Sequence, residues 1–143
     1  ERSVRIKLNA LGSEVKGKRI VMLDDSIVRG TTSARIVSML KEAGAKEVHL
    51  RISSPPFLWP CYYGTDIPNK NELIACKHTV KEIAEMSYAD SLDFLSLENL
   101  PRMLGEKCGG CCDACFSGRY PAPVPDSMIF NKTDDSCMPI KRL

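Results

Sequence analysis

Residues 19–33 read RIVMLDDSIVRGTTS, and this stretch decides how the rest of the chain is interpreted. Its first five residues form a short, near-continuous apolar run rich in β-branched side chains, which predicts a strand buried on both faces. Two adjacent acids, Asp24 and Asp25, end that run, and small polar residues follow them. The stretch therefore predicts a strand, a polar loop and the start of a helix.

The residues after this stretch predict a helix and a second strand. Apolar residues recur there at helical spacing, namely Ile36, Met39, Leu40 and Ala43. Hydroxyl side chains at positions 31–33 can cap the helix, and Gly44 suits the left-handed residue that ends one. Alternating apolar residues over 47–52 predict the second strand. The fold class is therefore α/β, built on a parallel βαβ unit with a right-handed crossover.

The sequence signals for the remaining helices and strands are weaker. We expect a loop over 12–17, short helices over 71–76, from Thr79 and over 97–104, a third strand over 92–95, and loop from Lys107 onward. The order of these elements predicts that the chain is divided in two. Residues 1–104 belong to the α/β domain, and residues 105–143 form a cysteine-rich segment with an irregular tail. A sheet covered by helix on one face leaves apolar surface exposed, which predicts self-association or marginal stability.

Composition limits the class of protein. The chain has 143 residues, of which 43% are hydrophobic and 27% are charged, with a net charge of +2. These values are typical of a globular domain and exclude a disordered chain. The sequence has no apolar run long enough to span a membrane, and its charge is too mild to indicate nucleic-acid binding. We therefore expect neither membrane nor nucleic acid as a partner.

The loop after the first strand has the composition of a ribose-phosphate site. A helix N-terminus attracts phosphate, Gly30 allows close backbone approach, and the Thr31 and Thr32 hydroxyls can donate to phosphate oxygens. Asp24 and Asp25 can accept hydrogen bonds from ribose hydroxyls or hold a divalent metal. The alternative is that the acids only end a strand and the hydroxyls only cap a helix. The spacing fits neither a Walker A loop nor a dinucleotide fingerprint.

This loop resembles the phosphoribosyl pyrophosphate (PRPP) motif of type I phosphoribosyltransferases. Three further segments resemble the amidophosphoribosyltransferase family: VRIKLN at 4–9, SPP at 54–56 with PCYYGTD at 60–66, and CFSGRYP at 115–121. The resemblance implies a partial type I phosphoribosyltransferase fold with a helical and loop C-terminal extension. It implies that PRPP is bound by Asp24, Asp25, Ser26, Ile27, Val28, Arg29, Gly30, Thr31 and Thr32. The two acids would also hold the Mg²⁺ that accompanies PRPP.

The resemblance also implies an activity for the whole enzyme. The family makes 5-phosphoribosylamine from PRPP and glutamine-derived ammonia, in the first step of purine synthesis. Cytoplasmic location, a homo-oligomer and feedback inhibition by purine nucleotides are expected with it. The family's N-terminal cysteine nucleophile has no counterpart at Glu1, so we expect a C-terminal fragment that is inactive alone and holds no catalytic residue.

A second class of function stays open at this point. The same fold and loop occur in non-catalytic modules that bind PRPP or nucleotides for regulation. The cysteine-rich segment and the segments at 54–56 and 60–66 favour the enzyme, because a regulatory module does not need them.

The cysteines suggest a metal site. The chain has seven cysteines, and four of them fall at 108, 111, 112 and 115, as two adjacent Cys-x-x-Cys pairs. Zinc, an iron–sulfur cluster or a redox pair would each fit this spacing. One branch of the family carries a structural 4Fe–4S cluster, which implies Cys61, Cys108 and Cys111 as ligands, with Cys112 as the alternative. The fourth ligand would precede Glu1, so we expect the cluster in the full-length parent and not in this chain.

Overall fold

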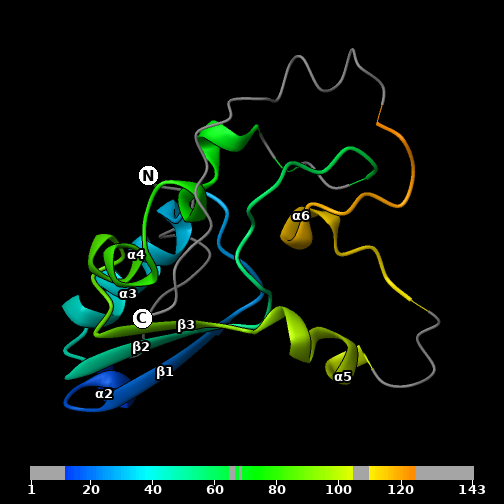
Figure 1. The fold of residues 1–143 in the computed structure, drawn as a ribbon. Coiled ribbons are helices and arrows are strands. Elements are labelled where there is room, and N and C mark those ends of the chain that lie inside the picture. The colour runs from blue at the N-terminus through cyan, green and yellow to red at the C-terminus, as the bar shows by residue number, and fades with distance from the viewer. Residues whose placement is uncertain (1–11, 65–66, 68, 105–109, 125–143) are drawn as a thin grey trace.

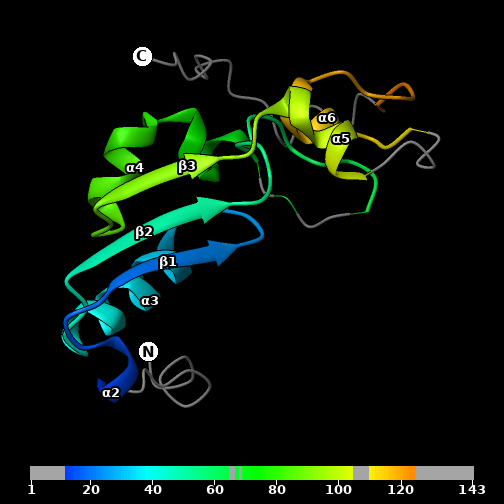
Figure 2. The same cartoon turned by 90° about the horizontal axis from the view of Figure 1, so that it is seen from below.

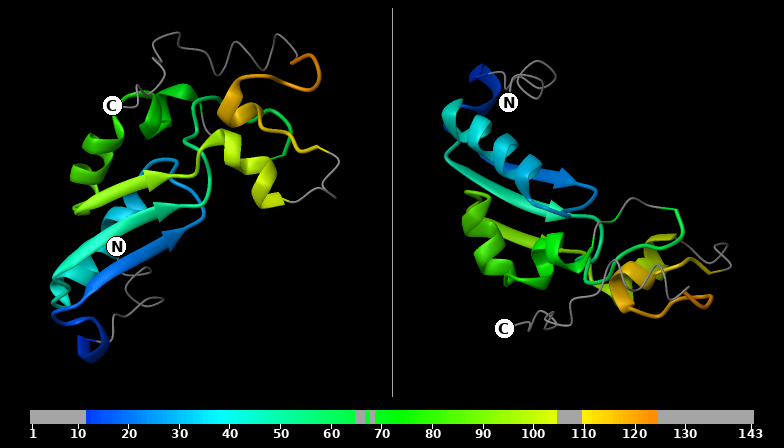
Figure 3. Two further views of the ribbon diagram at one scale, coloured as in Figure 1. Left: turned by 60° about the horizontal axis from the view of Figure 1, so that its bottom comes forward. Right: turned by 90° about the horizontal axis from the view of Figure 1, so that it is seen from above.

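The computed structural model describes residues 12–64, 67, 69–104 and 110–124, and it shows a three-stranded parallel sheet (Figure 1). The strands are β1 (Arg19–Asp24), β2 (Glu47–Ile52) and β3 (Ser91–Phe94), in the spatial order β1-β2-β3. Helix α3 (Thr31–Glu42) connects β1 to β2, and α4 (Val80–Met86) precedes β3. Both helices lie on the same face of the sheet (Figures 1 and 3). The predicted α/β class and parallel βαβ unit are confirmed.

The shorter elements differ in part from the predicted ones. The loop predicted at 12–17 is wrong at its start, because residues Gly12–Val15 form the helical turn α2. The helix predicted at 71–76 consists of two 3₁₀ turns, Lys70–Glu72 and Ile74–Cys76. A 3₁₀ turn at Leu97–Asn99 leads into α5 (Leu100–Leu104), and α6 (Ala114–Ser117) lies where only loop was predicted.

The main core lies between the sheet and the two helices. Its buried residues are Ile27, Val37, Val48, Leu50, Ile52, Ile74, Ala75, Ile83, Ala84 and Leu92. Within β1, Ile20 and Met22 pack against this core, whereas Val21 and Leu23 are 62% and 79% exposed. The prediction that β1 is buried on both faces is therefore wrong, because successive side chains of a strand point to opposite faces and both helices cover the same one.

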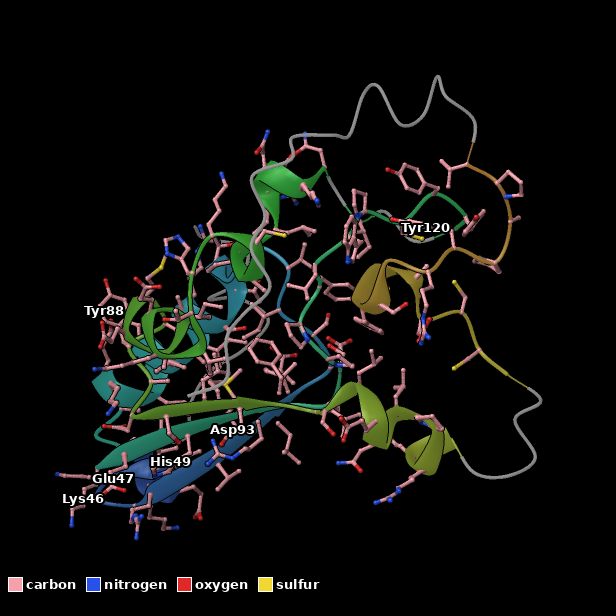
Figure 4. All side chains as sticks on the ribbon, in the orientation of Figure 1. Lys46, Glu47, His49, Tyr88, Asp93 and Tyr120 are labelled. Carbon is pink, nitrogen blue, oxygen red and sulfur yellow. The ribbon has the colours of Figure 1, made fainter. Side chains whose placement is uncertain are left out.

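The opposite face of the sheet is mostly polar. Glu47, His49 and Asp93 lie on it, away from α3 and α4 (Figure 4). The His49 ring nitrogens lie 2.9 Å from the Ser91 hydroxyl and 3.0 Å from a Glu47 carboxylate oxygen. The bonds from His49 and then Arg19 hold the pKa of Glu47 below its usual value. Glu47 and His49 bond to one another, and Asp93 pairs with Arg51. The large apolar side chains exposed on this face are those of β1.

A second, smaller core lies beyond the carboxyl ends of the strands. The three arrowheads point toward the end of the molecule where α5 and α6 lie (Figure 2). There, Phe57, Ile67 and Leu73 are buried, and Phe116 of α6 packs against them.

None of the helices in the described part of the chain has the length and hydropathy needed to span a membrane.

Candidate functional site

The predicted loop begins where two strand ends meet. Asp24 is the last residue of β1, and its carbonyl oxygen accepts hydrogen bonds from the Ser53 N–H (2.9 Å) and the Ser53 hydroxyl (3.2 Å). Ser53 follows directly after β2, which is paired in parallel with β1. The loop therefore starts at the carboxyl edge of the sheet, where open α/β sheets bind ligands.

The two adjacent acids have different surroundings. The Asp24 carboxylate accepts hydrogen bonds from the Asp25 backbone N–H at 3.0 Å and from the buried Ser33 hydroxyl of α3 at 3.2 Å. The Asp25 carboxylate is exposed and accepts a bond from the Ser26 hydroxyl at 3.1 Å. Asp24 therefore links the strand to the helix, whereas the Asp25 carboxylate stays exposed at the edge of the sheet.

The middle of the loop is anchored by one buried side chain. Ile27 is 2% exposed and belongs to the main core, which fixes the loop between the acids and the helix. The next residues run over the surface to Gly30, which has φ of +80°. Residues with a Cβ rarely adopt this left-handed conformation, so glycine is required at that point.

The first turn of α3 is open to a ligand. Gly30 occupies the N-cap position, and no side chain caps the helix. The prediction that residues 31–33 supply the cap is wrong, because Ser33 bonds to Asp24 instead, and Thr31 and Thr32 are exposed. An uncapped helix N-terminus of this length presents backbone N–H donors and the positive end of the helix dipole. The geometry fits an anion such as phosphate.

Arg29 is turned toward another segment. Its Nε and Nη2 atoms lie 2.8 Å and 2.6 Å from one carboxylate oxygen of Glu72. The Arg29 guanidinium therefore pairs with a carboxylate of the 3₁₀ turn Lys70–Glu72.

The segment around α6 is fastened to the loop that follows β2. The Trp59 ring has the Lys70 ammonium 4.0 Å from its centroid. A Cβ added to Gly118 would lie 2.7 Å from the Trp59 ring, and Gly118 has φ of +76°. The Tyr120 hydroxyl donates to the Pro60 carbonyl at 2.8 Å. We call Trp59, Lys70, Gly118 and Tyr120 the aromatic clasp.

Two cysteines, Cys61 and Cys115, lie near this clasp. Cys61 and Cys115 both pack against the second core. Burial, and then the charges of Cys61 and Cys112, raise the pKa of the Cys115 thiol to about 11. Burial, and then the neighbouring Tyr62, also raise the pKa of Tyr120. The predicted ligand Cys108 lies outside the described residues.

The cysteines that the structure describes are not arranged as a metal site. In the part of the chain that the structure describes, no three His, Cys, Asp or Glu side chains are placed to hold a metal ion. The described cysteines are thiols, and Cys111 and Cys112 are exposed. Cys61 and Cys115 come from different segments and both pack against the second core.

The structure adds site residues that the sequence did not single out. Ser33 and Ser53 fasten Asp24, and Glu72 and Ile74 contact the loop from a distant segment. Ser53 was within reach of sequence reasoning, because the ends of two neighbouring parallel strands meet at one edge. No pattern in the sequence pointed to Glu72 or Ile74.

The chain is similar to known amidophosphoribosyltransferases. It is 54% identical to the one from Synechocystis over 132 residues and 55% identical to the one from Bacillus subtilis over 129 residues, which are 92% and 87% of this chain. Each match spans 27% of the relative's length, so the chain corresponds to about a quarter of these proteins. No family model matches the chain.

Solved structures give the same result. The glutamine PRPP amidotransferase from B. subtilis, complexed with ADP and GMP, matches 88% of this chain with a TM-score of 0.76 and 49% identity. A structure described as the allosteric regulatory enzyme of purine biosynthesis matches 87% of the chain with a TM-score of 0.77 and 50% identity. These two matches cover 30% and 28% of the solved chains. The resemblance predicted from the motifs and the phosphoribosyltransferase-type fold are confirmed.

Proposed function

We propose that this chain is the C-terminal part of an amidophosphoribosyltransferase, and that its loop from Asp24 to Thr32 binds the ribose 5-phosphate end of PRPP. The observation that carries the proposal is the loop itself. It joins an exposed carboxylate to an uncapped helix N-terminus at the carboxyl edge of a parallel sheet, in a chain about half identical to these enzymes. The whole enzyme would form 5-phosphoribosylamine from PRPP and glutamine-derived ammonia.

Each part of the loop has a role in this proposal. The backbone N–H groups from Gly30 to Thr32 and the two threonine hydroxyls would donate to the 5′-phosphate oxygens. The Asp25 carboxylate would accept hydrogen bonds from the ribose hydroxyls, and Asp24 would hold the loop at the strand end. Ile27 and Val28 would contribute backbone atoms and an anchor rather than side-chain contacts with the ligand.

Mg²⁺ would accompany the ligand. Carboxylate oxygens are ligands that Mg²⁺ prefers, and it usually binds through one or two of them together with phosphate oxygens and water. The exposed Asp25 fits this role better than Asp24, whose two carboxylate oxygens already accept hydrogen bonds within the chain. The metal would neutralise charge on the pyrophosphate of the bound substrate.

The test is a titration of the chain with PRPP and Mg²⁺ by calorimetry. Replacing Asp25 with asparagine removes a charged acceptor, and we expect the affinity to fall about tenfold, the usual scale for a hydrogen bond to a charged group. Asp93→Asn is the matched control, because Asp93 is an exposed carboxylate on the opposite face of the sheet. Equal binding by the parent chain and the Asp25→Asn variant would refute the site.

The alternative function is a regulatory module that binds PRPP or nucleotides without catalysis. The segments after β2 and around α6 favour the enzyme, because they form a separate packed unit with cysteines. A module of this kind would bind PRPP in the same titration, so activity of the longer protein separates the two. Binding without any transfer of ammonia to PRPP would support the alternative.

We propose further that the parent enzyme holds a structural 4Fe–4S cluster beside α6. Cys61, Cys112 and Cys115 are favoured as its ligands, because Cys61 and Cys115 come from two segments that pack against one core, and Cys112 lies three residues before Cys115. Cys108 and Cys111, which the resemblance implies, stay as alternative ligands. The cluster would cross-link the two segments when bound, and binding would require the thiols to converge and to lose their protons.

Iron and sulfide analysis of the anaerobically purified longer protein tests the cluster, together with an absorption scan near 400 nm. We expect about four irons per chain, with loss of the absorption band in Cys115→Ser. Cys76→Ser is the control, since Cys76 bonds through its thiol to the Leu58 carbonyl. An active protein without iron would refute the cluster, and loss of the band in Cys111→Ser alone would restore the earlier ligand choice.

Several expectations from the resemblance stay predictions. They are feedback inhibition by purine nucleotides, a cytoplasmic location, a homo-oligomer, and the division into residues 1–104 and 105–143. The exposed Val21 and Leu23 support association through the open face of the sheet. The B. subtilis structure with ADP and GMP supports a nucleotide ligand for the longer protein.

A further inference from the structure

Three consecutive residues of the ligand loop rest on one distant segment. The Ile74 N–H donates to the Val28 carbonyl at 2.9 Å, and Glu72 pairs with Arg29 at 2.6 Å. The Ile74 side chain fills the space beside Gly30, where an added Cβ would lie 2.8 Å from its terminal carbon. We call Glu72, Leu73 and Ile74 the brace.

The brace is itself fixed in the molecule. Leu73 is fully buried in the second core, and Ile74 belongs to the main core. The two 3₁₀ turns that meet at Leu73 are closed by their own backbone hydrogen bonds, such as the one from the Leu73 N–H to the Lys70 carbonyl at 3.1 Å. A segment held in two cores is a rigid support for whatever it contacts.

The loop needs such a support. No side-chain hydrogen bond caps α3 at Gly30, and Gly30 has a left-handed conformation. The buried Ile27 fixes the loop before Val28, and α3 fixes it after Gly30. Between them, the contacts to the brace hold the backbone of Val28, Arg29 and Gly30 in one shape.

The ion pair in the brace has a geometric role. Both side chains are largely exposed, at 59% for Arg29 and 43% for Glu72. Exposed ion pairs contribute little to stability, so this pair matters chiefly for where it holds the loop. Two nitrogens of the Arg29 guanidinium bond to one Glu72 oxygen, which directs the charge toward the brace.

We propose that Glu72 is a positioning residue for phosphate binding, which acts by holding Arg29 and so the backbone donors of the loop. This inference rests on the proposed PRPP function. Arg29 is then a strut of the loop, and the backbone and threonine hydroxyls bind the phosphate. A small displacement of preorganised hydrogen-bond donors weakens the binding of a ligand even when the fold is intact.

The experiment is a calorimetric titration of the complete chain with PRPP and Mg²⁺. We expect Glu72→Gln to weaken binding about three- to fivefold, the range that a coupling of surface charges supports. Its melting temperature should change no more than that of Asp93→Asn, which breaks a comparable exposed ion pair with Arg51. The exchanged pair Arg29→Glu with Glu72→Arg should recover affinity relative to either single variant.

Each other outcome overturns the inference. Unchanged affinity in Glu72→Gln would show that the pair does not position the loop. Stronger binding would show that Glu72 withholds Arg29 from the phosphate, and failure of the exchanged pair would show that Arg29 itself contacts the ligand. If the unaltered chain does not bind PRPP, or if Asp25→Asn binds equally well, the proposed function fails instead, and the two failures are distinguished in one series.

Discussion

Gly30→Ala is expected to weaken binding of PRPP and Mg²⁺ up to about a hundredfold, the upper end of the scale for losing a hydrogen bond to a charged group. The new Cβ has two effects. It is strained at φ of +80°, and it lies 2.8 Å from the terminal carbon of Ile74, which must move. Because Ile74 also bonds to the Val28 carbonyl, a shift of either residue disturbs the whole loop. Calorimetric titration measures the affinity, and thermal unfolding measures the stability.

Gly17→Ala is the matched control for this variant. Gly17 has φ of +74°, close to that of Gly30, but nothing lies within 4 Å of an added Cβ. We expect a loss of about 1–2 kcal/mol from the left-handed conformation alone, with unchanged affinity for PRPP. Similar affinities in the Gly30→Ala and Gly17→Ala variants would contradict the role of the close approach between Gly30 and Ile74.

Gly118→Ala is expected to destabilise the aromatic clasp by about 2–4 kcal/mol, from backbone strain and overpacking together. The added Cβ would lie 2.7 Å from the Trp59 ring, which is rigid and cannot rotate away as a flexible chain end can. Lys70, which is 9% exposed, lies near the same ring. The segment around α6 should therefore separate from the loop after β2.

Fluorescence measures this change directly. Trp59 is the single tryptophan of the chain, so a shift of its emission to longer wavelength reports its exposure to water. Gly110→Ala is the control, because Gly110 also has a positive φ, +112°, with open space around it. If both variants show the same emission and melting temperature, the contact between Gly118 and Trp59 does not hold the clasp.

The sequence was sufficient for the elements whose signals are local. The apolar run at 19–23, the helical spacing from Ile36 to Ala43 and the alternation at 47–52 each depend on near neighbours. The chain forms β1, α3 and β2 there. Thr79 was also correctly placed at the start of α4, because its hydroxyl and the Glu82 carboxylate form a capping box. Signals of this kind survive packing because they are satisfied within one element.

The errors arose where packing decides. The apolar run of β1 looked like a strand buried on both faces, yet Val21 and Leu23 are exposed because α3 and α4 cover the same face. The hydroxyls at 31–33 looked like helix caps, but Ser33 bonds back to Asp24. In each case the residue types were compatible with two arrangements, and a distant part of the chain selected one.

By itself, the sequence determined the chemistry of the loop. Two carboxylates, a glycine and two threonines stand within nine consecutive residues, and contiguous residues stay close together in any fold. Only the tertiary structure decided which carboxylate stays exposed and what holds the loop in shape. Asp24 is fastened by Ser33 and Ser53, and Arg29 is paired with Glu72, which is 43 positions away. Contacts over such separations depend on how the strands and the two cores pack, which no local pattern encodes.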